Sequence, residues 1–334
     1  MKKFFKILFL LMTMISTLIS ISSISWLMIW VGLEINLLSI IPLMKEKNNI
    51  YSSEAAIKYF MIQAIASILF LSSIMLSIFS NILIMKEIFS ISTSLALLLK
   101  MGAAPFHFWL PEVISGLTWQ MSFIMLTWQK ISPMIILSYL TYTPMFLSIF
   151  IISSTLVSGI QGFNQTCLRK IMAYSSINHI SWMISSLLCS SMLWTYYFII
   201  YCLISWNIII IFTKLNIFNL NQMSTIFSFN KKMKFFFMLN FLSLGGLPPF
   251  LGFLPKWLTI NYLIKNNFYY ISLILIILTL ITLYFYLRLT FSAFSIKSSE
   301  TLIKIFYKMN FFQFFLNLLT LSSLMIYILI ANFL

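Results

Sequence analysis

Residues 100–112 read Lys100-Met-Gly-Ala-Ala-Pro-Phe-His-Phe-Trp-Leu-Pro-Glu112, and the fold is organised around this stretch. It brings together a glycine, two prolines, a histidine and two charged side chains in a chain that is otherwise largely apolar. Proline has no backbone N–H and its ring clashes with the preceding turn, so the stretch predicts an interrupted helix. The charged groups are then carried beside the interruption.

A second stretch repeats this pattern 144 residues later, as Leu244-Gly-Gly-Leu-Pro-Pro-Phe-Leu-Gly-Phe-Leu-Pro-Lys256. The shift places Gly102, Pro105, Phe106, Leu110 and Pro111 on Gly246, Pro249, Phe250, Leu254 and Pro255. Glu112 falls on Lys256, so the charge changes sign between the copies. Two matched helix breaks in a hydrophobic chain are typical of transporters built from internal repeats. The alternative is a pair of unrelated proline-kinked helices.

The bulk composition is that of a polytopic membrane protein. Of 334 residues, 61% are hydrophobic and 8% are charged, and the mean hydropathy is +1.01. A soluble protein carries roughly 25% charged residues. The net charge of +15 would suggest nucleic acid in a soluble protein, but no basic stripe with interleaved aromatics is present. We therefore expect membrane lipids, and no nucleic acid, as partners.

The chain shows no motif for holding a redox group. Cys167, Cys189 and Cys202 are widely separated without CxxC or metal-ligand spacing, and there is no glycine-rich phosphate or dinucleotide loop. We expect no metal, nucleotide, flavin, iron–sulfur cluster or haem on this chain. Aspartate is absent and Ile, Phe, Lys, Asn, Tyr and Met are abundant, which follows AT-rich codons and indicates an organellar gene.

The apolar runs predict an all-α fold in one membrane domain over residues 1–334, with about eleven transmembrane helices. The spans fall near 4–21, 24–44, 56–79, 88–110, 118–140, 144–163, 170–190, 193–213, 235–262, 268–289 and 311–332. Two inverted five-helix repeats, about 4–140 and 144–289, each have a broken fourth helix, and the helix at about 311–332 lies outside them. The first run is interpreted as a membrane helix rather than a signal peptide.

The distribution of basic residues supports an odd number of helices. With the N-terminus on one side, the connections on that side hold 16 Lys and Arg residues, those on the other side hold 2, and 3 lysines lie inside spans. Positive charge accumulates on the side where translation takes place, so the N-terminus is predicted to face that side. The two broken helices then run in opposite directions.

Four charged residues lie well inside predicted spans: Glu34, Lys100, Lys130 and Lys256. A charge at the centre of a membrane helix costs about 2.5 to 3.5 kcal/mol on insertion scales, which indicates that these groups are used. Burial also favours the neutral form of a lysine, so that proton exchange becomes accessible near neutral pH. The four residues are therefore the candidates for proton translocation.

Each candidate has a purely structural alternative. Glu34 could be neutral and hydrogen-bonded to Asn36 or to the backbone, and Lys130 could be held by local polar partners. The alternative for Lys100 is a snorkelling structural lysine, which its distance from a helix end and the carbonyls and water freed by the Pro105 break argue against. Lys256 could lie closer to one membrane face. We expect Glu34 and Lys100 to form a switching pair, and Lys130 to link two half-channels from an unbroken apolar span.

Three further residues are weaker candidates. Glu112 could be an ordinary interfacial charge at the end of its span. His107 stands within the first break, where a proton relay and a hydrogen-bonded structural histidine are both possible. His179 lies mid-span among small polar residues, a pattern that suits either a hydrated path or tight helix packing.

The motifs Gly-Ala-Ala-Pro-Phe-His-Phe-Trp-Leu-Pro-Glu, Arg-Lys-Ile-Met-Ala-Tyr-Ser-Ser-Ile-Asn-His and Gly-Gly-Leu-Pro-Pro-Phe-Leu-Gly-Phe-Leu-Pro-Lys resemble the chain 2 family of mitochondrial NADH–ubiquinone oxidoreductase (complex I), with an insect source expected. These are antiporter-like subunits of the membrane arm, and the resemblance covers essentially the whole chain. It implies that Glu34 is the modulating glutamate, Lys100 the pumping lysine, Lys130 the bridging lysine and Lys256 the lysine of the second broken helix. Bacterial relatives have three further N-terminal helices, which this chain lacks.

The resemblance implies a proton-translocating subunit that carries no redox centre of its own. NADH, FMN, iron–sulfur clusters and ubiquinone would be handled by other subunits of complex I, which are the expected partners. The implied location is the mitochondrial inner membrane, with the N-terminus in the matrix and the C-terminus in the intermembrane space. Two alternatives remain: a self-contained cation/proton antiporter of the same fold, and a structural membrane spacer.

Overall fold

The computed structural model describes residues 2–46, 49–78, 83–140, 143–222, 231–294, 311 and 314–320. Within these residues the chain is helical, apart from an isolated β-bridge between Cys167 and Asn219. A helix satisfies its backbone N–H and C=O groups internally, which is what a chain surrounded by lipid requires. The chain divides into two compact units, Met1–Ser153 and Ser154–Leu334.

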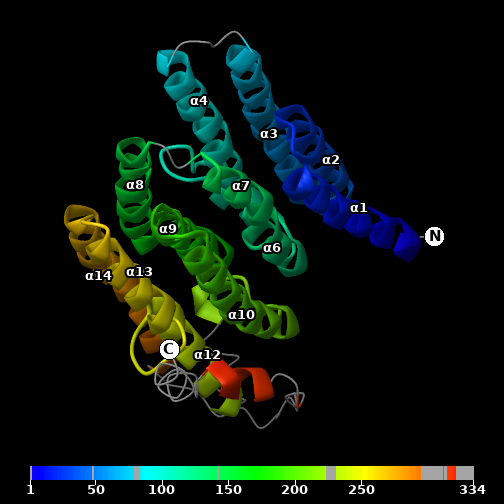
Figure 1. Ribbon diagram of the computed structural model, residues 1–334. Helices are drawn as coiled ribbons and strands as arrows, with labels where there is room; N and C mark the ends of the chain where they lie inside the picture. The colour runs from blue at the N-terminus through cyan, green and yellow to red at the C-terminus, as the bar shows by residue number, and fades with distance from the viewer. Residues whose placement is uncertain are drawn as a thin grey trace. The chain divides into compact units, whose positions relative to one another are not determined.

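The first unit is built from four long helices, followed by three shorter ones. They are α1 Lys2–Ser22, α2 Trp26–Met44, α3 Ile50–Ile78, α4 Leu83–Met101, α5 Trp109–Gly116, α6 Trp119–Leu126 and α7 Trp128–Ser138. In Figure 1, α1 packs on α2, α2 on α3 and α3 on α4, while α7 packs on α4. Helix α5 also packs on α3. A Cβ added to Gly116 would lie 2.6 Å from the carbonyl oxygen of Tyr51, so glycine lets the end of α5 press against the start of α3.

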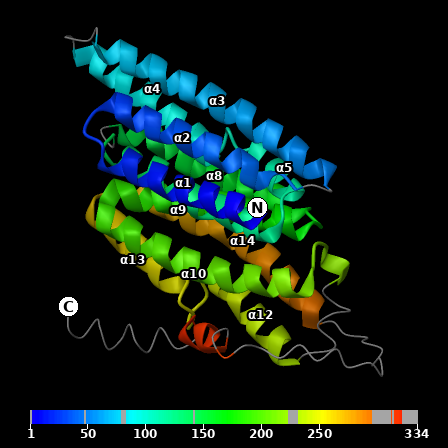
Figure 2. The same ribbon diagram turned by 90° about the vertical axis from the view of Figure 1, so that its right-hand side faces the viewer.

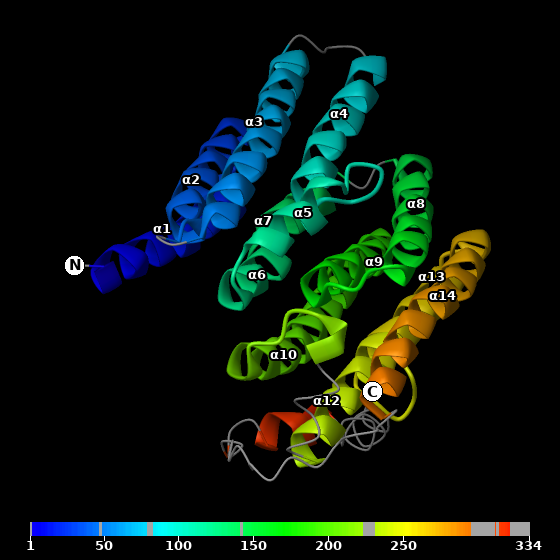
Figure 3. The same cartoon turned by 180° about the vertical axis from the view of Figure 1, so that it is seen from behind.

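The second unit is centred on one deeply buried helix. Its elements are the end of α8 Pro144–Phe163, which begins in the first unit, with α9 Leu168–Cys189, α10 Ser191–Leu215, α12 Lys231–Gly245, α13 Phe253–Lys265 and α14 Tyr269–Phe294. Helix α9 contacts α10, α13 and α14, and α12 packs on α10 and α14 (Figures 2 and 3). Nearly every residue of α9 from Leu168 to Leu187 is buried, including its serines. Small side chains let neighbouring helices approach α9 closely.

Six of the described helices are long and apolar enough to cross a membrane. They are Phe4–Ser22, Trp26–Met44, Ile50–Ser77, Pro144–Phe163, Ser191–Leu215 and Tyr269–Phe291, and Lys234–Gly245 is a shorter apolar helix. Their large apolar side chains are exposed along whole faces, for example at Leu18, Ile68 and Leu280. Such faces are expected against lipid or other membrane proteins.

Most predicted spans agree with the helices of the structure. Helices α1, α2, α8, α9 and α10 begin and end within two residues of their predictions. Helix α3 begins at Ile50, earlier than predicted, because the Asn49 side chain accepts a hydrogen bond from the Tyr51 N–H at 3.1 Å and caps a polar first turn. Helix α14 extends to Phe294. The last predicted span, 311–332, lies mostly outside the described residues.

The prediction of one unbroken span around Lys130 is wrong. Helix α6 ends at Leu126 and α7 begins at Trp128, with Thr127 at φ −117° and ψ −71° between them. The Thr127 hydroxyl donates to the Phe123 carbonyl at 2.7 Å and competes with the backbone ladder. Pro133 cannot donate to the carbonyl one turn before it, which weakens the start of α7 further.

Candidate functional site

The first helix break follows Lys100 at the end of α4. Gly102 has φ +75°, a conformation that favours glycine, and a Cβ there would also lie 2.9 Å from Leu110 Cδ1. The N–H groups of Gly102 and Ala103 donate to the carbonyls of Leu99 and Leu98 at 3.2 and 3.1 Å. These bonds end the helix, and the chain becomes helical again at Trp109.

The carbonyls at the end of α4 are taken by neutral donors. Trp109 Nε1 donates to the Leu99 carbonyl at 3.3 Å, and Gln63 Nε2 donates to the carbonyl of Lys100 at 3.1 Å. The Lys100 side chain is only 7% exposed, and within the described part of the chain its amine forms no hydrogen bond or ion pair. The sequence indicated that freed carbonyls and water can solvate this amine, and the carbonyls of Leu99 and Lys100 accept from other donors.

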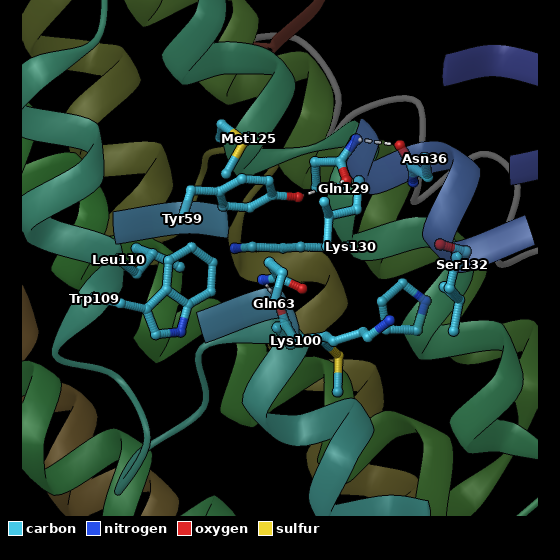
Figure 4. A pocket seen from close by; sticks show the side chains of 14 residues that line it. Asn36, Tyr59, Gln63, Lys100, Trp109, Leu110, Met125, Gln129, Lys130 and Ser132 are labelled. Carbon is cyan, nitrogen blue, oxygen red and sulfur yellow. Dashed lines mark hydrogen bonds between the residues drawn. The ribbon is translucent and has the colours of Figure 1, made fainter. Parts of the chain in front are cut away.

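Lys100 and Lys130 line one small cavity in the first unit, drawn in Figure 4. Lys130 is 1% exposed, and its side chain lies between the Tyr59 ring and Gln63, with the amine end toward Trp109. About 20 Å³ of the cavity is accessible to the centre of a water molecule. That is enough for one or two waters beside polar groups. The cavity therefore offers a polar, hydratable space at two buried amines.

An amide bridge ties the Lys130 helix to the Glu34 helix. Gln129 Nε2 donates to Asn36 Oδ1 at 3.2 Å, and the Tyr59 hydroxyl donates to Gln129 Oε1 at 3.5 Å. One structural alternative for Glu34 was a hydrogen bond to Asn36. In the structure Asn36 is bonded to Gln129 instead. The bridge joins Gln129, which adjoins Lys130 in the sequence, to Asn36, which lies two residues after Glu34.

Glu34 lies at the middle of α2, and its Oε1 atom is buried without a hydrogen-bond partner. Its charge acts on both Lys100 and Tyr59. The described residues show no Glu34–Lys100 ion pair within 4.0 Å. Glu34 does not line the cavity, although Leu33 and Leu37 of the same helix do. The acid and the lysine thus interact through space without direct contact.

The second helix break holds its lysine differently. Gly246 has φ +79°, and the N–H groups of Gly246 and Leu247 end α12 on the carbonyls of Ser243 and Leu242 at 3.0 and 3.3 Å. Lys256, in the first turn of α13, is 6% exposed, and its Nζ donates to the carbonyls of Gly245 at 2.9 Å and Leu244 at 3.4 Å. Both breaks contain a cis peptide bond, at Ala104–Pro105 and Pro248–Pro249.

The weaker candidates lie in three separate environments. His107, in the first break, has Nδ1 3.2 Å from the Pro105 carbonyl oxygen and is 2% exposed. His179 on α9 has Nδ1 2.9 Å from the Tyr197 hydroxyl. Glu112 is exposed and does not line the cavity; its Oε2 atom forms an ion pair with Lys58 Nζ at 2.8 Å. The described residues contain no cluster of three or more His, Cys, Asp and Glu side chains that could hold a metal ion.

Sequence reasoning did not select Tyr59, Gln63 or Trp182. Tyr59 and Gln63 are four residues apart on one face of α3, and polar side chains at that spacing in an apolar span were a usable signal. No pattern in the sequence singled out Trp182. Its position beside Lys256 follows only from the packing of α9 on α13.

Comparisons with known proteins give consistent results. The sequence model of the family described as "NADH:quinone oxidoreductase/Mrp antiporter, TM" matches residues 23–282. The chain is 48% identical over 298 residues to NADH-ubiquinone oxidoreductase chain 2 of Anopheles gambiae, covering 88% of this chain and 87% of that protein. It is 44% identical over 330 residues to chain 2 of Locusta migratoria, covering 98% and 96%. For chain 2 of Ovis aries the identity is 40% over 300 residues, covering 86% and 84%.

Solved structures share the fold at lower identity. A chain of respiratory complex I from Thermus thermophilus with bound Aureothin matches with a TM-score of 0.84 and 21% identity, covering 97% of this chain and 77% of that one. A chain of the Mrp complex from Dietzia sp. matches with a TM-score of 0.83 and 13% identity, covering 96% and 75%. At these identities the likeness shows the fold alone.

Proposed function

The chain belongs to the NADH:quinone oxidoreductase/Mrp antiporter family, among the NADH-ubiquinone oxidoreductase chain 2 proteins, and from this premise we propose how its buried charges move protons. It is a membrane-arm subunit of complex I in the mitochondrial inner membrane, where proton translocation is coupled to electron transfer from NADH to ubiquinone. Other subunits of the membrane arm and lipids cover its apolar faces, and the redox cofactors belong to the wider complex.

The observation that carries the proposal is the cavity shared by Lys100 and Lys130 in the first unit. Two buried amines line one hydratable space, and among the described residues Lys100 forms no direct ion pair with Glu34. Lys100 exchanges a proton with this space, Lys130 passes it on, and Lys256 serves the second helix break. Glu34 sets the charge state of Lys100 through space, because an opposite charge favours the protonated amine.

The two breaks support the repeats and the topology proposed from the sequence. Gly102 and Gly246 both adopt positive φ and both end a helix through an equivalent pair of backbone hydrogen bonds. Eleven spans in two inverted repeats place the N-terminus and the connection between Lys214 and Lys234 in the matrix, and the C-terminus in the intermembrane space. In intact mitoplasts, a protease added outside is expected to spare that connection. Cleavage there would refute the orientation.

The alternative of a self-contained cation/proton antiporter is weaker. The relatives at 40–48% identity are oxidoreductase subunits, whereas the Mrp likeness rests on 13% identity. This chain also has no Asp with which to coordinate a cation such as Na⁺.

A pair of lysines on the same helix tests the proposal. Lys256 is buried at the start of α13, whereas Lys265 is exposed at its end. NADH-driven proton uptake per assembled complex is expected to fall at least about tenfold in Lys256→Met, because a methionine cannot exchange a proton. Lys265→Met is expected to pump at the normal rate. Equal pumping by both variants would remove Lys256 from the path.

A further inference from the structure

Lys256 carries its charge in an environment without a carboxylate from this unit. After Ser153 the sequence contains a single acidic residue, Glu300, and it lies outside the described residues. The described part of the second unit therefore offers no acidic side chain to the Lys256 amine. The amine contacts two carbonyls at the end of α12 and faces one aromatic ring.

The aromatic ring belongs to Trp182, on the central helix α9. The Lys256 Nζ lies 5.8 Å from the centroid of the ring. A cation within about 6 Å of an indole face is attracted by the ring quadrupole, and the attraction grows when water is excluded. Both side chains are buried, Trp182 at 1% and Lys256 at 6% exposure, so this attraction is little screened.

Trp182 is not held for its N–H group. Its Nε1 atom is buried and has no hydrogen-bond partner among the described residues. A buried indole normally pairs its N–H, so the polar function of this side chain lies in its face. That face is turned toward the Lys256 amine.

We propose that Trp182 is a positioning residue for Lys256, which holds the amine in its charged form at the second helix break through a cation–π interaction. The inference rests on the proposed role of Lys256 in proton translocation. The two carbonyls fix the place of the amine at the negative end of the α12 dipole, and the centroid of the ring lies 5.8 Å from it. The charged form is favoured by roughly five- to thirtyfold from the ring.

Substituting Trp182 by phenylalanine or by methionine distinguishes the effect of the aromatic face from the effect of side-chain volume. Both leave a similar space where the indole was, but only phenylalanine keeps an aromatic face. In assembled complex I, Trp182→Phe is expected to retain NADH-driven proton uptake within about twofold, and Trp182→Met to lose about fivefold or more. Trp194 is the matched control, because it is also a buried tryptophan whose Nε1 lacks a partner among the described residues, and its ring stacks on the Phe198 ring. Trp194→Phe and Trp194→Met are expected to differ little.

The same substitutions in a Lys256→Met variant give a test that does not depend on pumping, because it measures the yield and stability of the complex. With Lys256→Met the cation is gone, so Trp182→Phe and Trp182→Met are expected to give the same yield and melting temperature of the complex. In the wild-type background the Met variant is expected to be the less stable. Equal effects in the wild-type background, or a difference that persists with Lys256→Met, would overturn the inference. Normal pumping by Lys256→Met alone would instead refute the proposed role of Lys256.

Discussion

The two helix breaks share a backbone and differ in how they hold a lysine. In each, a glycine at positive φ ends a helix: its N–H donates to the carbonyl three residues before it, and the next residue's N–H donates to the carbonyl five residues before that residue. In the first break, Gln63 and Trp109 occupy the helix-end carbonyls and leave the Lys100 amine without a hydrogen bond. In the second, Lys256 itself is the donor to those carbonyls. The same backbone conformation therefore holds one buried amine without a hydrogen bond among the described residues and another that is hydrogen-bonded to the helix end.

The difference lies in which side of the break carries the lysine. Lys100 precedes its break, so its side chain leaves the helix end and reaches the cavity that it shares with Lys130. Lys256 follows its break and folds back over Gly246, where a Cβ would lie 2.7 Å from the lysine Cδ. Lys100 is thus open to the charge of Glu34 and to water, whereas Lys256 is fixed by backbone dipoles.

The two glycines give the largest expected effects. Alanine in a left-handed conformation costs about 1 to 2 kcal/mol, so both Gly102→Ala and Gly246→Ala are expected to lower the yield of assembled complex. Gly246→Ala also displaces the Lys256 side chain, and its pumping per assembled complex is expected to fall about tenfold or more. Gly102→Ala presses on Leu110, a packing residue, and keeps more activity per complex. Equal specific activities would show that Lys256 is not held by its break.

Neutralising Glu34 is expected to have a smaller effect, confined to the first break. Glu34→Gln removes the charge that favours protonated Lys100 while keeping the shape, so coupled turnover should slow about three- to tenfold with normal assembly. Glu46→Gln, beyond the end of α2, is the isosteric control and should pump normally. If Glu34→Gln pumped like its control, the first break would not depend on a carboxylate, and the contrast between the two breaks would lose its basis.

The sequence predicted the membrane fold and both breaks because they depend on local chemistry. Glycine and proline within apolar helices identified the interruptions at residues 100–112 and 244–256, and the lysines beside them stood out by their cost in lipid. Hydropathy also located α1, α2, α8, α9 and α10 to within two residues. These features need no knowledge of which helices meet.

The partners of the lysines depend on tertiary contacts and could not be predicted. Gln63 reaches the Lys100 carbonyl across 37 residues of sequence, and Trp182 faces Lys256 from another helix. The break at Thr127 was missed for a different reason, since a threonine hydroxyl competing with the backbone is too common in helices to mark an interruption. Asn36, one of the two partners considered for Glu34, accepts a hydrogen bond from Gln129, a contact between helices that the sequence does not reveal.

The most direct test of the central claim is proton uptake by assembled complexes that carry Lys130→Met or Lys130→Arg. Lys130 is 1% exposed and shares its cavity with Lys100. The methionine variant removes about 3 kcal/mol of buried charge, so it should assemble as well as or better than the wild type. Neither side chain can exchange a proton, because arginine stays protonated at any relevant pH, and both variants should lose most coupled NADH oxidation. Normal pumping by the assembled Lys130→Met complex would contradict the account.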